Sequence, residues 1–114
     1  MEIVNIGTDI EEVSRFENLE KKVLERLFTP KEIEYCFSKK NIAQHLAARY
    51  SAKEAVFKAL PFDKIAFKKI QVLNDKSGAP IVTVKDRRAN DLEFKISLSH
   101  TKKFAQAIVL VYRK

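Results

Sequence analysis

The segment from Asn41 to Leu60 carries the longest helical pattern of the chain, and Pro61 ends it. Successive residues of an α-helix are rotated by about 100°. Glu54 therefore falls on one stripe with four apolar residues: Ala43, Ala47, Tyr50 and Phe57. A carboxylate on an apolar stripe is costly to desolvate unless a cation neutralises it. The pattern leaves two interpretations of Glu54: a buried ligand of a cation, or a surface ion pair with Lys58 worth about 0.3 to 0.5 kcal/mol.

The length of 114 residues is that of one domain, which we place over residues 1–114. No segment approaches the roughly 20 apolar residues that a membrane-spanning helix needs, so no membrane association is expected. The first residues lack the basic start and apolar run of a signal peptide. The only cysteine, Cys36, has no disulfide partner in the chain and is interpreted as a packed helical thiol. These features predict a cytoplasmic protein.

The net charge of +7 predicts an acidic partner, which could be nucleic acid, a membrane surface, a phosphorylated ligand or an acidic protein. The 22 basic residues are scattered along the chain, without a long basic tail. One hypothesis is therefore a small basic nucleic-acid-binding module that uses residues of the second half: Lys68, Lys69, Lys85, Arg87 and Arg88. No RNP-like or zinc-knuckle pattern accompanies these residues.

Residues 1–9 alternate in the manner of a β-strand, with Val4, Ile6, Thr8 and Ile10 on one side. Asp9 points away from this apolar side. Gly7 lies on the same face as Asp9 and leaves room for a ligand or another backbone to approach. Asp9 is therefore interpreted either as a site residue or as the N-cap of the next helix.

The apolar spacing of residues 11–28 predicts a helix, or two short helices divided near Asn18, with Arg15 on the exposed side. Thr29, Pro30 and Glu32 form the pattern of a capping box with proline at the first helical position. This pattern predicts a new helix that runs to about Phe37.

After Pro61 the pattern changes from helical to alternating, which predicts strands over residues 65–73, 80–84, 93–100 and 104–112. Residues 74–78 have the composition of a hairpin turn, and residues 85–91 are expected to form a loop or one helical turn. The last strand is apolar on both faces, so one face is a candidate oligomer interface. The predicted fold class is α+β, with helices packed on a small antiparallel sheet.

Asp9 and Glu54 are the two carboxylates that these patterns single out, and the strand that ends in Ser97 to His100 adds further polar groups. Two histidines and one cysteine without ligand spacing do not make a zinc site. Magnesium is typically held by one or two carboxylates, with water and substrate phosphates completing its shell. The pair therefore predicts a magnesium-dependent phosphate-transfer site, without the Gly-rich loop of nucleotide triphosphatases.

Three segments occur in order along the chain: Ile6-Gly7-Thr8-Asp9-Ile10 followed by Arg15, then Arg49-Tyr50-Ser51-Ala52-Lys53-Glu54-Ala55-Val56-Phe57-Lys58, then Ser97-Leu98-Ser99-His100-Thr101. They resemble three motifs of the holo-acyl-carrier-protein synthases, the small bacterial type of 4'-phosphopantetheinyl transferase. Each motif alone is weakly specific, but three at family spacing in a chain of family length are specific. The resemblance covers essentially the whole chain.

The resemblance implies transfer of the 4'-phosphopantetheine group from coenzyme A to a serine of apo acyl carrier protein. This reaction releases adenosine 3',5'-bisphosphate and supports fatty acid biosynthesis. The resemblance also implies that Asp9 and Glu54 hold Mg²⁺ against the diphosphate of coenzyme A. Glu54 would help to deprotonate the attacking serine, directly or through a water, and Lys58 would stabilise charge on the phosphates.

The resemblance further implies a homotrimer with sites between subunits, which suits the doubly apolar last strand. Arg15 corresponds to the arginine that docks the carrier protein, in keeping with the net charge of +7. The nucleotide phosphates are expected to contact four residues: Arg49, His100, Thr101 and Lys102.

Two segments depart from the family pattern. The turn reads Gly78-Ala79-Pro80 where the family often has a basic residue in the middle, so one contact to coenzyme A is expected to be missing. The segment from Pro61 to Lys64 replaces a glycine-containing loop. A carrier-binding subunit without catalysis is a third hypothesis, against which the intact Asp9, Glu54 and Lys58 argue.

Overall fold

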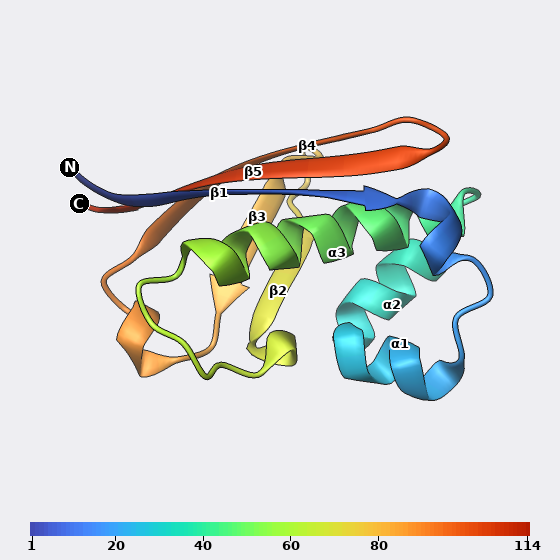
Figure 1. The fold of residues 1–114 in the computed structure, drawn as a ribbon, viewed down its shortest axis with the longest axis horizontal. Helices are drawn as coiled ribbons and strands as arrows, with labels where there is room; N and C mark the ends of the chain where they lie inside the picture. Colours follow the sequence, from blue (N-terminus) through green and yellow to red (C-terminus); the bar gives the residue numbers. More distant parts are fainter.

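The long helix α3 (Ile42–Ala59) lies across one face of a three-stranded antiparallel sheet (Figure 1). The sheet has the order β1-β5-β4, and β2 and β3 form a separate two-stranded hairpin. The computed structural model describes residues 1–114. The other elements are β1 (Glu2–Glu12), α1 (Lys21–Leu27), α2 (Pro30–Phe37), β2 (Ile70–Asn74), β3 (Pro80–Val84), β4 (Glu93–His100), β5 (Phe104–Arg113) and three single 3₁₀ turns, Val13–Phe16, Phe67–Lys69 and Arg87–Ala89. The predicted α+β class is confirmed.

β1 is held against α3 by a glycine. A Cβ atom on Gly7 would lie 2.1 Å from the Ala55 carbonyl oxygen and 2.9 Å from the Ala59 Cβ, so a larger residue would push the strand off the helix. The predicted close approach at Gly7 is thus that of another backbone. The same face of β1 carries Asp9, which this contact holds beside α3.

The predicted apolar stripe of α3 is confirmed in part: Ala47 is buried, and Ala43 and Tyr50 pack against the core cluster around it. Phe57 is 37% exposed, and Ala43 and Tyr50 are half-buried. The helix is covered by the sheet on one side and by α1, α2 and β2 on the other, so its core face is broader and consists mainly of small residues. The buried apolar positions are Leu46, Ala47, Ala48, Ala52, Ala55, Val56 and Ala59, and the polar residues Arg49, Ser51 and Lys53 are buried as well. Alanines on this face let the helix approach the sheet closely.

The N-terminal prediction of helical structure from residue 11 is also corrected. β1 continues to Glu12, a 3₁₀ turn follows over Val13–Phe16, and α1 begins only at Lys21. The chain does break at Asn18, which has φ 56°. The strand predicted over residues 65–73 is shorter in the structure, because a 3₁₀ turn precedes β2. The hairpin turn, β3 and β4 agree with the predicted ranges.

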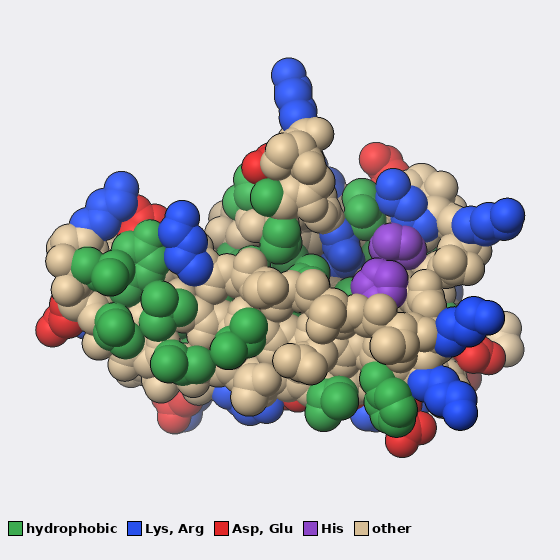
Figure 2. Space-filling view, turned by 90° about the horizontal axis from the view of Figure 1, so that it is seen from above, with side chains coloured by type: hydrophobic (Ala, Val, Ile, Leu, Met, Phe, Trp, Pro, Cys, Tyr) green, Lys and Arg blue, Asp and Glu red, His purple; other side chains and the backbone are tan.

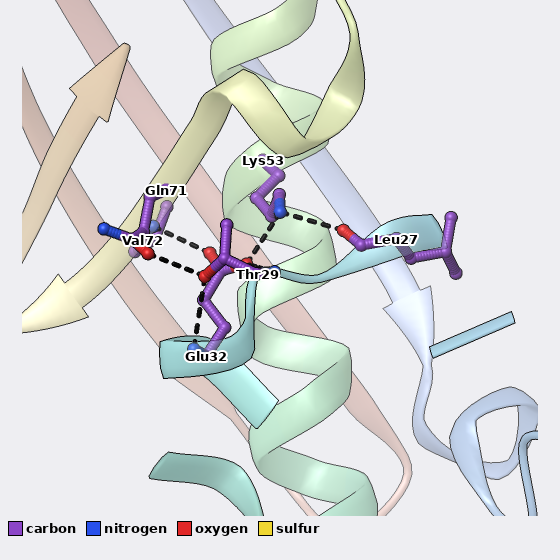
Figure 3. Close-up of polar contacts among 6 residues, drawn as sticks. All are labelled: Leu27, Thr29, Glu32, Lys53, Gln71 and Val72. Carbon is purple, nitrogen blue, oxygen red and sulfur yellow. Dashed lines mark hydrogen bonds and ion pairs between the residues drawn. The ribbon is translucent and has the colours of Figure 1, made fainter. Parts of the chain in front are cut away.

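A fully buried ion pair joins α2, α3 and β2 (Figure 3). The Lys53 Nζ donates to Glu32 Oε1 at 2.7 Å and to the Leu27 carbonyl at 2.8 Å. Glu32 also accepts from the backbone N–H groups of Thr29, in the predicted capping box, and of Val72 on β2. Since Lys53 immediately precedes Glu54, this network fixes how α3 is rotated toward β1.

The face of the sheet that points away from α3 is largely apolar and exposed. Figure 2 looks onto this face and shows hydrophobic side chains spread over it. Its members are 46 to 63% exposed: Ile3, Ile6, Ile10, Phe104 and Ile108. On β5 the alternate residues are buried beneath α3, as the two-sided pattern of this strand predicted. No helix is long and apolar enough to cross a membrane.

Candidate functional site

Asp9 and Glu54 lie near each other where β1 passes α3, close enough for the charge of Asp9 to act on Glu54. The Ser51 hydroxyl donates to the Asp9 carbonyl at 2.9 Å, which ties this point of the strand to the helix. Lys58 Nζ lies 3.3 Å from Asp9 Oδ1, so the lysine pairs across the two elements. The ion pair between Glu54 and Lys58, which was one of the two interpretations of Glu54, does not form. Asp9 also caps no helix. Asp9, Glu54 and Lys58 thus lie in one region of the molecule, at the crossing of β1 and α3.

The protein itself does not fully neutralise or hydrogen-bond the carboxylates of Asp9 and Glu54. Asp9 is 12% exposed in its side chain, and its Oδ2 is buried without a hydrogen-bond partner. Burial and the Asp9 charge raise the pKa of Glu54, although Lys58 opposes the shift. A cation with oxygen ligands would give the Asp9 Oδ2 a partner and would stabilise the ionised form of Glu54.

Glu11 is a third carboxylate of this region, and the sequence analysis missed it. It lies two residues after Asp9 on the same face of β1 and is 8% exposed. Burial and the neighbouring Asp9 raise the pKa of Glu11 to about 7, against the opposing effect of Arg15. The period-two alternation would have indicated Glu11 if β1 had been extended past Asp9. No group of three His, Cys, Asp or Glu side chains is arranged to hold a metal by itself.

Arg15 lies on the turn that follows β1. Its Nη1 is 2.7 Å from Glu11 Oε1, and the side chain is 64% exposed, as predicted. The guanidinium is thus anchored at one edge next to the carboxylates and open to solvent on its other side.

Arg49 and His100 line a separate cavity of about 290 Å³ between α2, α3, β4 and the β2–β3 turn. Arg49 is 3% exposed, stacks 4.2 Å from the centre of the Tyr35 ring and donates to the Asn74 side chain. Its Nε is buried without a partner. A buried guanidinium with an unused donor beside a cavity is suited to an anionic ligand.

The turn after β4 completes this side of the molecule. Thr101 and Lys102 are exposed there, and Gln44 at the start of α3 donates to the Thr101 carbonyl at 3.0 Å. The Thr101 hydroxyl accepts backbone N–H groups within the turn. Gly78 and Pro80, which flank the departure from the family pattern at Ala79, also line the cavity.

The predicted residues thus form two groups on opposite sides of α3. In the sheet, Glu11 pairs with Ala105 on β5, and Ala105 pairs with His100 on β4. The two outer strands are separated by two strand spacings, about 10 Å, and the buried Ala105 packs beneath α3. One chain therefore presents the carboxylates at the β1 edge and the Arg49 cavity at the β4 edge.

The fold and the motifs define a class of enzyme. The chain belongs to the 4'-phosphopantetheinyl transferase superfamily, whose family profile matches residues 5–109. It is 41% identical to a holo-[acyl-carrier-protein] synthase of Geobacter sp. (strain M21), over 97% of this chain and 99% of that protein.

Solved structures agree with this assignment. A holo-(acyl-carrier-protein) synthase from Bacillus anthracis in complex with CoA (3',5'-ADP) superposes with a TM-score of 0.86 at 33% identity, over 100% of both chains. The holo-[acyl-carrier-protein] synthase of Helicobacter pylori in complex with coenzyme A gives a TM-score of 0.80 at 31% identity, over 93% of this chain and 98% of that chain. The nucleic-acid-binding hypothesis has no support in these comparisons.

Proposed function

We propose that this protein transfers the 4'-phosphopantetheine group of coenzyme A to a serine hydroxyl of apo acyl carrier protein. The observation that carries the proposal is the contact of β1 and α3, which brings Asp9, Glu54 and Lys58 together in a member of the transferase superfamily. In the reaction the serine oxygen forms a bond to the phosphorus that bears pantetheine. The bond between that phosphorus and the bridging oxygen breaks, and adenosine 3',5'-bisphosphate leaves. The expected cytoplasmic location stays a prediction.

Asp9 and Glu54 are the residues that would hold Mg²⁺. The orphaned Asp9 Oδ2 and the destabilised Glu54 carboxylate fit this ion, which prefers oxygen ligands and keeps open positions for water and phosphate. When bound, the ion would neutralise charge on the diphosphate.

Glu54 and Lys58 are assigned the proton and charge chemistry. A carboxylate whose pKa is raised is a better base near neutral pH than an ordinary glutamate, so Glu54 is suited to accept the serine proton, directly or through a water. The Lys58 side chain is 49% exposed and its Nζ lies beside Asp9, which supports a role in stabilising charge on the phosphates.

The Arg49 cavity is the proposed site of the nucleotide phosphates, with His100 in its wall and Thr101 and Lys102 in the adjacent turn. The buried Arg49 Nε supports this assignment because no acceptor of the protein forms a hydrogen bond with it. Lys102 would contribute long-range attraction from the surface.

A homotrimer is proposed because a single chain separates the two groups of residues. Helix α3 stands between the carboxylates and the Arg49 cavity, so one active site that uses both draws them from neighbouring subunits. The exposed apolar face of the sheet supplies a surface for such an assembly.

The direct test is incubation of the protein with coenzyme A, magnesium and a purified apo carrier protein, followed by intact mass measurement of the carrier. We expect the mass to increase by one phosphopantetheine group, and the increase to disappear with excess chelator. An unchanged carrier mass, with a known synthase active in the same mixture, would contradict the proposed function.

A further inference from the structure

His45 occupies the wall of the Arg49 cavity without an assigned role. It lies one helical turn before Arg49 on α3, so both side chains project toward the same cavity, which His100 closes from β4. The two imidazole rings are 5.8 Å apart, and the Tyr35 ring meets His45 edge-on at 5.8 Å. Figure 2 shows the two histidines, in purple, side by side at the surface with Lys and Arg side chains around them.

The groups that face His45 are cationic or neutral. Lys39 lies 4.8 Å and Arg49 4.2 Å from the centre of the Tyr35 ring, and Tyr35 itself touches His45. His100 faces it from β4. None of the groups that act on the His45 charge is a carboxylate. The cavity therefore concentrates positive charge around an imidazole that has no counter-ion.

This environment determines the charge of His45 in the free protein. Burial, followed by the charges of Arg49, His100 and Lys39, lowers the pKa of His45, so its imidazole is neutral near pH 7. A phosphate group inside the cavity would reverse the sign of the local field, because an opposite charge favours the protonated form. Binding of a phosphate and protonation of His45 would then support each other by linkage.

We propose that His45 is an additional phosphate-binding residue, which takes up a proton as a phosphate group of coenzyme A enters the cavity and thereby makes binding tighter at lower pH. The proposal rests on the proposed function, which supplies coenzyme A as the ligand. It adds to Arg49 a second donor from α3 that becomes charged only when the anion is present. The 3'-phosphate, a monoester, and the diphosphate share the chemistry that His45 would recognise.

The experiment is titration calorimetry of coenzyme A at constant magnesium, in buffers of different ionisation enthalpy, between about pH 6.5 and about pH 8.5. The slope against buffer ionisation enthalpy gives the number of protons taken up per ligand. We expect the wild type to take up more protons per ligand than His45→Phe, because phenylalanine keeps a planar ring but cannot be protonated; the comparison cancels any proton that the 3'-phosphate itself releases. As pH falls, the ratio of the wild-type affinity for coenzyme A to that of His45→Phe should rise by up to about tenfold per pH unit.

A second variant and a second ligand separate the remaining explanations. His45→Gln keeps a neutral donor, so we expect it to bind like the wild type at the upper end of the pH range and to lack the gain at the lower end. 3'-Dephospho-coenzyme A tests which phosphate is involved. If the difference in proton uptake between the wild type and His45→Phe disappears with this ligand, His45 is assigned to the 3'-phosphate, and if the difference stays unchanged, His45 is assigned to the diphosphate. Melting temperatures of the variants confirm that they are folded.

The outcomes distinguish this inference from the proposed function. If the wild type binds coenzyme A and both variants show its proton uptake and pH profile, His45 does not bind the phosphate. If the wild type does not bind coenzyme A at all, the proposed function itself fails, and this inference fails with it.

Discussion

The carboxylates of Asp9 and Glu54 come from different elements and are expected to act as one unit. If they share one magnesium ion, removing either spoils the site, so Asp9→Asn and Glu54→Gln should each lower the transfer rate by on the order of 100-fold. The double variant should lose little more, since residues that act together are not additive. Transfer rates of the four proteins, read by carrier mass, decide this. Additive losses would instead indicate independent roles.

Glu11 gives the metal-free protein a specific dependence on pH. Its pKa is raised to about 7, so the folded state binds this proton more tightly than the unfolded chain. The associated stability is fully present below the unfolded pKa of 4.5 and is lost as pH rises through about 7. We expect Glu11→Gln to lose less free energy of unfolding than the wild type between these pH values. Urea unfolding with chelator present measures the difference, and parallel pH curves would contradict the prediction.

Arg15 is expected to dock the carrier protein from its exposed position beside Glu11. Arg15→Glu should raise the apparent KM for an acidic carrier about tenfold or more and leave the affinity for coenzyme A nearly unchanged. Higher salt should raise the apparent KM of the wild type for the carrier toward that of the variant, because charge pairs in solvent are screened. Equal KM values at low ionic strength would remove Arg15 from the docking surface.

The buried pair of Glu32 and Lys53 determines how α1, α2, α3 and β2 are joined. Both side chains are 0% exposed, so removal of one partner leaves an uncompensated charge in the core. Glu32→Gln and Lys53→Met should each lower the free energy of unfolding by about 3 to 5 kcal/mol, and the double variant by less than the sum. Urea unfolding measures these changes.

A surface pair provides the control for this prediction. Lys114 and Glu93 lie 3.2 Å apart with side chains 81% and 42% exposed. Lys114→Met should therefore cost less than about 1 kcal/mol. A comparable loss for the buried and the surface variants would show that the Glu32–Lys53 network does not organise the core.

Local sequence patterns were sufficient to predict most helices and strands, but not how these elements pack together. The capping box at Thr29 predicted the start of α2, and the alternation of apolar and polar residues predicted β3, β4 and β5. Both signals act over a few residues. The burial of Lys53 could not be read from its position, since its partner Glu32 is 21 residues away and belongs to another helix. The full width of the buried face of α3 was missed for the same reason, because the surrounding elements decide which of its side chains are covered.

The predicted site shows the same limit. Local patterns and the family motifs both singled out Asp9 and Glu54. The positions of Glu11 and His45 depend on the length of β1 and on the cavity that four elements enclose. Both residues lie at regular spacing from a predicted neighbour, two from Asp9 on a strand and four from Arg49 on a helix. Spacing could have suggested them only after the elements were known.

The carboxylates and the Arg49 cavity are separated within one chain, so a complete active site that uses both requires assembly of several subunits. Each half of the proposed site is intact in one chain, but α3 lies between them. Light scattering should therefore report a trimer that buries the apolar face of the sheet, and a monomer at micromolar concentration would contradict the shared site.

Mixed assemblies test the shared site by function. Asp9→Asn and Arg49→Met chains should each be nearly inactive alone. When equal amounts are unfolded in urea and refolded together, a site that takes Asp9 from one subunit and Arg49 from the next is intact in roughly a quarter of cases, by random assortment in a closed oligomer. A site built within one chain would never be restored. His100→Ala, at an exposed position, replaces Arg49→Met if that buried substitution prevents folding. We expect the refolded mixture to recover transfer activity that the two separately refolded proteins, combined afterwards, do not show.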